Sequence, residues 1–474
     1  MQLGDGRVDW QRRSCVMGRD RGRSAHPMRR TIYLLLIAVF GSLLAEEVAI
    51  VKTSAAESKF SIPATDAGLP GAGPIRRYGW FQKLWVSKRS TWAKRVEQDQ
   101  GAVVFLGDSI TQGWTDKFRG HFAGMKKANR GISGDTTRGV LIRLKEDVLA
   151  LNPSAVVLLI GTNDLEEGAD PETIAANTKL ILAALKKHNG DMPVIVCKVF
   201  PSSARKKRPT DKIKKINELV AAVVKGDEQV TLLETWMLYA DENGDAPKEV
   251  MPDLLHLNPQ GYAMWAASLR PVLARYGFLE TEPDEFKLEP GFVSLFNGKD
   301  LTGWGYRKTP PRRKSKKPNP NRPKFVEIKK PIAFAGKTAS NDGRYVAKNG
   351  RLIVTTPAEG RRIQQLWTTE EFGTDFILKL EFRATPYADS GVFIRKPQLQ
   401  CRDYRLAGPY KDLKKYKPQD WNEMVVTVRG GVAHCTCNGE ILNAKMPVPE
   451  TGPIGLEGDR GQMEYRRIRL KRIN

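Results

Sequence analysis

The sequence predicts two domains of different fold class, an α/β domain followed by an all-β domain. Between residues 75 and 280, apolar runs typical of buried parallel strands alternate with amphipathic segments of helix length. From residue 291 onward, short segments alternate apolar with charged residues between turn signals, which is typical of half-buried antiparallel strands. A chain of 474 residues is also too long for one ordinary core.

The α/β pattern starts with a helix expected over 75–98, which carries apolar residues at helical spacing. Its tryptophans could line a sugar site, although aromatic residues at this spacing more often belong to a core. The segment 102–106 is continuously apolar and β-branched, which indicates a strand covered on both faces. The elements expected after it include a helix at 135–149, a strand at 155–160, a helix at 171–187, a strand at 194–199, a helix at 211–224, a strand at 230–233 and a helix at 259–275. This alternation predicts a parallel sheet with helices on both sides.

The all-β pattern is clearest in the segments 376–383 and 423–429. In both, apolar residues alternate with charged or polar ones, and the second segment runs into the turn Gly430-Gly431. An all-β sandwich is the most economical fold for such strands.

The N-terminal segment has the layout of a secretory signal peptide. Arg29 and Arg30 precede an apolar run from residue 32 to 44, which ends in small residues and is followed by acidic ones. We therefore expect a signal peptide at 28–45 that directs export to the periplasm or the cell exterior, with no stable membrane insertion after its removal. An uncleaved N-terminal anchor is the alternative.

The remaining boundaries follow from composition. Met28 is a natural start for such a signal, so we interpret residues 1–27 as an over-extended gene start. The Ala-, Ser-, Pro- and Gly-rich segment after the signal is expected to be a flexible linker. The expected divisions are a linker at 46–74, the α/β domain at 75–280, a linker at 281–290 and the β-sandwich domain at 291–474.

The net charge of +24 is unevenly distributed. Residues 307–330 hold eleven Lys or Arg against the single acid Glu327, in a Pro- and Asn-rich background. This segment is interpreted as a solvated loop, and a contact for polyanions is the alternative. Nothing in the sequence resembles a nucleic-acid-binding module, so no nucleic-acid partner is expected.

Four cysteines follow the signal segment, namely Cys197, Cys401, Cys435 and Cys437. The last two alternate on one face of an expected strand, which suits neither a mutual disulfide nor a familiar zinc spacing. We expect buried thiols or one disulfide that includes Cys401.

Ser109 is the candidate nucleophile. It comes just after the first strand, and ligands of open α/β sheets bind at the carboxyl ends of the strands. A turn followed by a helix N-cap is the alternative interpretation of the same residues. His256 is the candidate base, because it stands in the loop before the last helix, and Asp253 lies three residues before it, where it could orient the imidazole.

Two further turns offer donors for a developing oxyanion. Gly134 would let a backbone N–H group approach a substrate closely, and Asn163 offers a side-chain amide after the next strand. Each turn alone could equally be ordinary capping chemistry.

These stretches together resemble the SGNH, or GDSL, hydrolase superfamily. The matching blocks, in family order, are Gly107-Asp108-Ser109, Gly134, Gly161-Thr162-Asn163-Asp164 and Asp253-x-x-His256. The resemblance implies a flavodoxin-like three-layer α/β/α fold, with Ser109 as nucleophile, His256 as base and Asp253 as its orienter. It also implies an oxyanion hole formed by the Ser109 and Gly134 N–H groups and Asn163, with no metal or cofactor. The residues around Gly134 look most like the branch of platelet-activating factor acetylhydrolase subunits and carbohydrate acetylesterases, which implies short acyl groups.

The segment 291–474 resembles the 3-keto-disaccharide hydrolase domain family, which implies a concanavalin-like β-sandwich, or jelly roll. The matching stretches are 295–304, 390–395, 420–423 and 452–456. The family often has Glu-x-Gln-x-x-Asp where this chain has Gln398-x-Gln400-x-x-Asp403, and Leu-Gln-x-His where it has Leu456-Glu457-Gly458-Asp459. We therefore favour a carbohydrate-binding role over catalysis, with Arg395, Gln400 and Asp403 as contacts and Trp304 as a stacking platform.

The sequence as a whole predicts an exported serine ester hydrolase that removes short acyl groups, above all acetyl, from carbohydrate. A lipid-directed esterase or lysophospholipase is one alternative, and a bifunctional enzyme that also cleaves 3-keto-glycosides is another. A cell-surface adhesion module with a vestigial hydrolase is a third, but the complete set Ser109, Asp253 and His256 argues against it.

Overall fold

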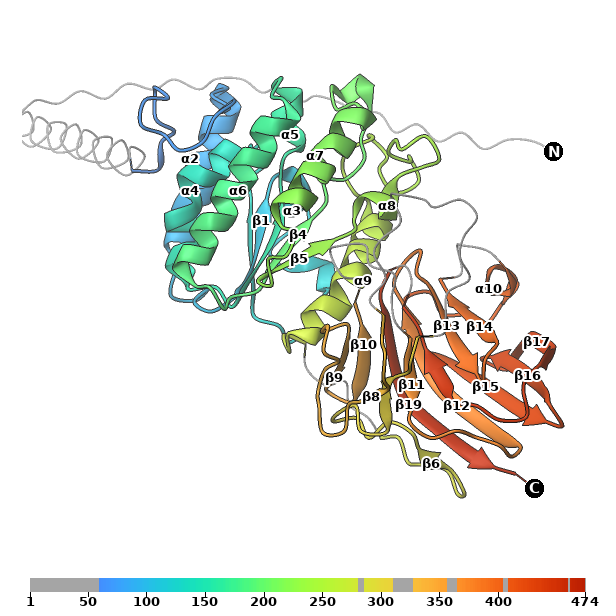
Figure 1. Ribbon diagram of the computed structural model, residues 1–474. Coiled ribbons are helices and arrows are strands. Elements are labelled where there is room, and N and C mark those ends of the chain that lie inside the picture. The colour runs from blue at the N-terminus through green and yellow to red at the C-terminus, as the bar shows by residue number, and fades with distance from the viewer. Residues whose placement is uncertain are drawn as a thin grey trace, which may run out of the picture. The chain divides into compact units, whose positions relative to one another are not determined.

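The computed structural model describes residues 59–279, 285–309, 327–355, 365–403, 408–458 and 461–473 (Figure 1). The predicted start segment, the predicted signal peptide and most of the basic loop 307–330 lie outside these residues. Among the described residues, no helix combines the length and the apolar character that crossing a membrane requires.

The first domain is built on a parallel sheet, and in the described residues this sheet has five strands in the order β2-β1-β3-β4-β5. The strands are β1 Val103–Gly107, β2 Lys127–Gly131, β3 Ala155–Leu159, β4 Val194–Cys197 and β5 Val230–Leu233. This is the flavodoxin-like order, in which β1 and β3 flank the point where the winding direction reverses. The predicted α/β/α fold is thereby confirmed.

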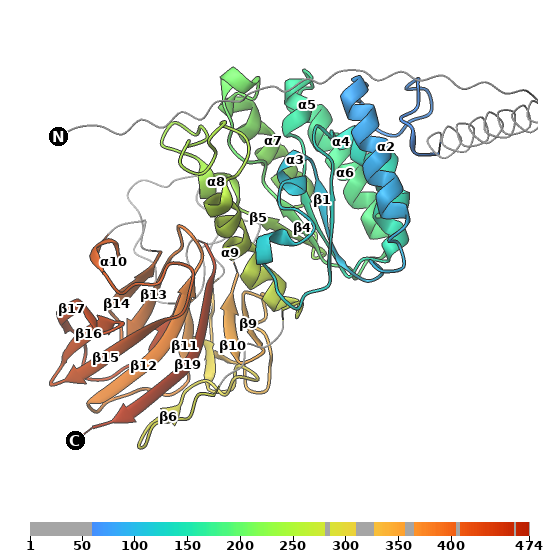
Figure 2. The same ribbon diagram turned by 180° about the vertical axis from the view of Figure 1, so that it is seen from behind.

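Helices cover both faces of the sheet. They are α2 Gly79–Ala93, α3 Ser109–Gln112, α4 Thr137–Asp147, α5 Thr162–Glu166, α6 Pro171–His188, α7 Thr210–Val223, α8 Trp236–Tyr239 and α9 Pro259–Arg275. Alternate residues of β1 enter two separate cores: Val104 and Leu106 join α4, α6 and α7, whereas Val103 and Phe105 join α9. Helix α2 packs outside α4, as Figure 2 shows.

Several predicted elements are shorter than their apolar patterns suggest, including the strand at 194–199 and the helix at 75–98. The strand expected at 194–199 stops at Cys197, because Val199 bonds the side chain of Asn217 instead of a neighbouring strand, with an N–H···Oδ1 distance of 2.7 Å. The helix expected at 75–98 occupies only Gly79–Ala93, and Tyr78 before it is extended.

Part of the predicted flexible linker 46–74 is docked on the first domain. The Asn177 side chain on α6 donates to the carbonyl of Ala72 at 2.8 Å, and the Thr136 hydroxyl donates to that of Pro74 at 2.9 Å. For this stretch the linker prediction is wrong, because polar side chains of the domain satisfy backbone groups that composition alone assigns to solvent.

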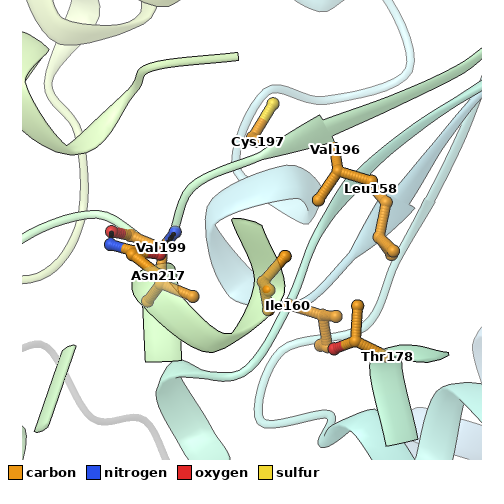
Figure 3. Close-up of a pocket in the computed structure, with 8 residues that line it drawn as sticks. Leu158, Ile160, Thr178, Val196, Cys197, Val199 and Asn217 are labelled. Carbon is orange, nitrogen blue, oxygen red and sulfur yellow. Dashed lines mark hydrogen bonds between the residues drawn. The ribbon is translucent and has the colours of Figure 1, made fainter. Parts of the chain in front are cut away.

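The core between the sheet and helices α6 and α7 contains one small cavity of about 10 Å³ (Figure 3). Its lining residues are Leu158, Ile160, Thr178, Val196, Cys197, Val199, Asn217 and Val220. A space of this size holds about one water molecule. It is therefore a packing feature of the domain and too small for a substrate.

The second domain is all-β, and its two antiparallel sheets have, in the described residues, eight and six strands. The larger has the order β17-β16-β15-β12-β19-β10-β9, with β6 paired to β19, and the smaller has the order β14-β13-β18-β11-β7-β8. The strands of the larger sheet are β6 Val293–Ser294, β9 Tyr345–Lys348, β10 Arg351–Val354, β12 Phe376–Ala384, β15 Asn422–Arg429, β16 Val432–Cys437, β17 Glu440–Pro447 and β19 Met463–Arg472. Those of the smaller are β7 Trp304–Tyr306, β8 Ile332–Ala333, β11 Leu366–Thr368, β13 Asp389–Ile394, β14 Gln398–Arg402 and β18 Ile454–Leu456. A short helix, α10 Pro409–Asp412, follows β14. One apolar core joins residues of both sheets, which confirms the predicted sandwich.

The four cysteines of the described region are buried and unbonded. Burial raises the pKa of Cys197 to about 12, so its thiol stays protonated at neutral pH. Of the two alternatives, the structure supports buried thiols.

Candidate active site

The structure brings Ser109, His256 and Asp253 into one hydrogen-bonded chain. Ser109 is the first residue of α3, directly after β1. Its Oγ lies 2.9 Å from Nε2 of His256, and Nδ1 of that ring lies 2.7 Å from Oδ2 of Asp253. The His256 and Asp253 side chains are 46% and 44% exposed, so a substrate can reach these hydrogen-bonded side chains from solvent. A hydroxyl, an imidazole and a carboxylate in this sequence can carry out nucleophilic acyl transfer.

The loop that carries Asp253 and His256 is fixed by hydrogen bonds among its own residues and by one hydrogen bond from Ser202. Oδ1 of Asp253 accepts the N–H groups of Leu255 at 3.1 Å and His256 at 2.8 Å. Leu254 has a φ of +64°, and its carbonyl accepts the hydroxyl of Ser202 at 2.8 Å. Partial burial works toward a higher pKa for Asp253, but the hydrogen bonds from His256 outweigh it and lower the pKa below its usual value. The carboxylate therefore stays ionised behind the imidazole.

Helix α3 is fixed by two bonds to its backbone. The Tyr262 hydroxyl on α9 donates to the carbonyl of Ile110 at 2.8 Å, and Nδ2 of Asn129 donates to that of Thr111 at 2.8 Å. Asp108 caps the helix, since its Oδ1 accepts the Ile110 N–H at 2.9 Å. The stretch thus contains the helix N-cap of the alternative interpretation, but the capping residue is Asp108, so the Ser109 hydroxyl remains available.

Asp108 is fully buried, and its second carboxyl oxygen has no hydrogen-bond partner among the described residues. Burial raises the pKa of this carboxyl to about 7. Because the pKa of Asp108 is higher in the folded protein than in the unfolded chain, this carboxyl stabilises the fold most at pH values below its unfolded pKa. Its stabilising contribution is lost as the pH rises through about 7.

We expect Asp108→Asn to remove this pH dependence while keeping the cap, because Asn caps helices as well as Asp does. Relative to the wild type, its free energy of unfolding should rise by roughly 2–3 kcal/mol between pH 5 and pH 8. Urea titrations at both pH values measure the difference. The exposed Asp116→Asn serves as the control, and parallel pH curves for wild type and Asp108→Asn would contradict the assignment.

Two of the three predicted oxyanion donors, Gly134 and Asn163, lie on turns that follow β2 and β3. Gly134 has a φ of +88°, and a Cβ there would lie 2.8 Å from both Nη1 of Arg76 and Cη2 of Trp80, so only glycine fits. Asn163 is the second residue of α5 and is buried. The two turns are joined, because the Asp164 carboxylate accepts the backbone N–H of Thr137 at the start of α4 at 3.0 Å.

The orientation of the Asn163 amide is set by an arginine that the sequence did not point to. Nη2 of Arg208 donates to Oδ1 of Asn163 at 2.9 Å. On the other side of the same amide, Nδ2 of Asn163 donates to the carbonyl of Asp135 at 3.0 Å. Arg208 is buried and also donates to the carbonyl of Thr162 at 3.0 Å and to Glu166 at 2.8 Å. An amide nitrogen has two hydrogens, so one remains for a substrate oxyanion. A lone arginine in a basic loop gives no sequence signal for this role.

We expect Arg208→Lys to lower kcat by about 10- to 100-fold with little change in KM, since a single ammonium nitrogen cannot reproduce the fork in which Nε bonds Thr162 while Nη2 bonds Asn163 and Glu166. Steady-state kinetics on p-nitrophenyl acetate measure both constants. Arg205→Lys, on the same loop and exposed, is the matched control. An unchanged kcat, or a change in KM alone, would show that Arg208 does not position the amide.

In the second domain, three of the four predicted sugar contacts are buried. Trp304 is 0% exposed and its indole N–H donates to the carbonyl of Leu295 at 2.7 Å, so it has no free face for stacking and that prediction is wrong. Arg395 is also buried and donates to the carbonyls of Pro449 and Thr374. Asp403 is buried and accepts the N–H of Tyr387 at 2.9 Å. Arg395 and Asp403 therefore hold the backbone instead of facing a ligand.

Gln400 is half-buried on β14, and its role stays a prediction. The same sheet carries a polar cluster that the sequence did not identify. The Glu457 carboxylate accepts Nε2 of Gln365 at 2.7 Å and Nε2 of Gln398 at 2.5 Å. In β14, buried Leu399 and Cys401 alternate with the half-buried glutamines, so Gln398 and Gln400 share the face directed away from the core. The sequence shows the alternation of apolar residues and glutamines in β14, but it does not show which residues of other segments, such as Glu457, lie beside those glutamines.

Comparisons with known proteins agree with this geometry. The model of the GDSL-like Lipase/Acylhydrolase family matches residues 105–264, and that of the 3-keto-alpha-glucoside-1,2-lyase-like domain matches residues 291–471. Platelet-activating factor acetylhydrolase IB subunit alpha2 of Bos taurus is 29% identical over 204 residues, which cover 42% of this chain and 87% of that protein.

Two solved structures are similar to parts of the chain. A GDSL-like lipase from Bacteroides thetaiotaomicron is 26% identical with a TM-score of 0.36, covering 40% of this chain and 96% of its own. A lipase/acylhydrolase from Enterococcus faecalis is 22% identical with a TM-score of 0.33, covering 39% of this chain and 100% of its own. From the family matches, the chain is a hydrolase with a GDSL-like lipase/acylhydrolase domain, followed by a 3-keto-alpha-glucoside-1,2-lyase-like domain.

Proposed function

We propose that the first domain is a serine esterase that removes short acyl groups, above all acetyl, from carbohydrate. The observation that carries the proposal is the pair of hydrogen bonds made by the His256 ring. Its Nε2 lies 2.9 Å from Oγ of Ser109, and its Nδ1 lies 2.7 Å from Oδ2 of Asp253. In this proposal Ser109 is the nucleophile, His256 the general base and Asp253 the group that orients it.

In the first half of the reaction, Oγ of Ser109 attacks the ester carbonyl while Nε2 of His256 takes its proton. The negative charge that develops on the carbonyl oxygen is met by the N–H groups of Ser109 and Gly134 and by Nδ2 of Asn163. When the tetrahedral intermediate collapses, the C–O bond to the alcohol breaks, and His256 gives its proton to the leaving oxygen. An acyl-enzyme on Ser109 remains.

In the second half, His256 takes a proton from a water molecule, whose oxygen attacks the acyl carbon. The same oxyanion donors stabilise the second intermediate, and the ester bond to Ser109 breaks as its oxygen regains a proton. His256 mediates every proton transfer in this reaction, and Asp253 remains ionised throughout.

Two observations support a short acyl group and a sugar. The curated relatives include acetylhydrolase subunits, whose name refers to removal of an acetyl group. The second domain matches a family named for glucoside chemistry, so an esterase for acylated glycan and a glycan-directed domain would share one substrate. A lipid-directed esterase or lysophospholipase is the alternative, because the matching family model is described as a lipase as well as an acylhydrolase.

We further propose that the second domain holds the glycan on the face of Glu457, Gln398 and Gln400. Carboxylate and amide groups side by side can bond adjacent sugar hydroxyls. A bifunctional enzyme that also cleaves 3-keto-glycosides predicts turnover of those glycosides by the full chain carrying Ser109→Ala. Binding without turnover in this variant supports the holding role.

The substrate class is tested by assaying the full chain on acetylated xylan, acetylated pectin, a short-chain acetyl phospholipid and a lysophospholipid. The proposal expects release of acetate from at least one polysaccharide with a kcat/KM at least tenfold above that for either lipid. The reverse preference would establish the lipid-directed alternative.

Export through a signal peptide at 28–45 remains part of the proposal. An acetylated polysaccharide is a substrate outside the cytoplasm, so the two proposals are compatible. N-terminal sequencing of the protein secreted by its host is expected to begin shortly after residue 45, and a start before Met28 would contradict it.

A further inference from the structure

Two aromatic side chains are exposed together at the start of α2. Tyr78 and Trp80 are each 52% exposed, and their ring centroids lie 6.5 Å apart with an angle of 14° between the planes. The other tryptophans of this helix, Trp85 and Trp92, are buried in the core. Leaving large aromatic surface in water is unfavourable, and adjacent exposed aromatics commonly mark a binding surface.

The pair lies beside the Gly134 turn and beside the C-terminal end of α5, the short helix that carries Asn163. Cη2 of Trp80 lies 2.8 Å from the place where a Cβ on Gly134 would be. The Tyr78 hydroxyl donates to Oε2 of Glu167 at 3.1 Å, and Glu167 directly follows α5, the helix that carries Asn163. A substrate whose carbonyl oxygen lies between Gly134 and Asn163 therefore has the aromatic pair beside it.

We infer that Tyr78 and Trp80 form a subsite that stacks against a pyranose ring of the acylated glycan. The inference rests on the proposed function and names the group that recognises its substrate. The C–H face of a pyranose is apolar and flat, and it matches an aromatic face, while Glu167 at the edge can accept hydrogen bonds from ring hydroxyls.

The charges around the pair favour a neutral ring over a cationic headgroup. Arg76 pairs with Glu166 and with Glu167, the latter at 2.7 Å, and Arg208 pairs with Glu166 at 2.8 Å. Two arginines and two glutamates leave no excess negative charge to hold a trimethylammonium group over the rings. The same ionic edge is unsuited to a long acyl chain, because burying it against hydrocarbon is costly.

The test compares Trp80→Ala with Trp80→Phe on acetylated xylotetraose, p-nitrophenyl acetate and acetylcholine. We expect Trp80→Ala to lower kcat/KM for xylotetraose acetate about five- to tenfold relative to p-nitrophenyl acetate, whereas Trp80→Phe keeps most of the selectivity. The control Leu180→Ala removes a similarly exposed apolar side chain on α6, away from the site, and should leave the ratio unchanged. An equal loss on all three substrates, or a selective loss on acetylcholine, overturns the inference.

A binding assay separates this inference from the proposed function. In the Ser109→Ala background, calorimetric titration with acetylated xylotetraose should give a Kd that Trp80→Ala weakens about five- to tenfold. A Kd that does not respond, or no binding at all, overturns the subsite. Absence of ester hydrolysis by the wild type together with this Kd shift would instead refute the proposed function and leave the sugar subsite standing.

Discussion

Ser109→Ala is expected to lower kcat for p-nitrophenyl acetate by about 10⁴- to 10⁶-fold, the loss seen when a serine hydrolase loses its nucleophile. The reason is that no other described hydroxyl is bonded to the imidazole of His256, whose Nε2 lies 2.9 Å from the Ser109 Oγ. Without that oxygen the acyl-enzyme cannot form, and only the oxyanion donors remain to assist direct attack by water. Steady-state hydrolysis, followed by absorbance, measures the loss.

The fold should not change in this variant, because α3 is held through its backbone by Tyr262 and Asn129. Thermal unfolding within about 2 °C of the wild type is the check. Ser87→Ala, which alters an exposed serine on α2, is the matched control and should retain full activity. Substantial turnover by Ser109→Ala would show that another group attacks the ester.

Asp253→Asn is expected to lower kcat by about 10³- to 10⁴-fold while KM changes little. Oδ2 of Asp253 lies 2.7 Å from Nδ1 of His256, so the carboxylate accepts that N–H and leaves Nε2 free to take the Ser109 proton. An amide can instead donate to Nδ1, which stabilises the tautomer that carries its hydrogen on Nε2. That hydrogen would face Ser109 and block proton transfer.

The pH profile distinguishes this role from a structural one. The lowered pKa of Asp253 keeps its carboxylate ionised, so its own protonation does not produce the acid limb of the wild-type profile near neutral pH. Glu249→Gln, an exposed change near the same loop, should leave kcat unaltered. A normal kcat for Asp253→Asn across pH 5 to 9 would contradict the assigned role.

The sequence predicts the site well where function depends on position along the chain. Ser109 follows β1 and Asn163 follows β3, and these strands are neighbours in the sheet, so residues at their carboxyl ends meet. His256 was identifiable because it stands in a loop beside Asp253. The apolar runs also located β1, β3, β4 and β5, since buried parallel strands leave little choice of residue type, whereas β2 at Lys127–Gly131 has no such run.

The remaining features depend on which side chains meet in three dimensions. The contact of Arg208 with Asn163 spans 45 positions, and nothing local distinguishes this arginine from Arg205. Helical spacing placed Trp80, Trp85 and Trp92 in one stripe, but only the packing of α2 shows that Trp80 is exposed. Trp304 failed as a sugar contact for the same reason, because a tryptophan in a short strand can face the core or the solvent.

The most direct test of the account is covalent labelling of the full chain with a fluorophosphonate. The Ser109 oxygen attacks phosphorus, a P–O bond forms, and fluoride leaves, so intact-mass spectrometry should show one adduct per chain. Peptide mapping should place it on Ser109, with loss of esterase activity in proportion to labelling and no adduct on Ser109→Ala. An adduct on another residue, or full activity in a chain labelled at Ser109, would contradict the claim that Ser109 is the nucleophile.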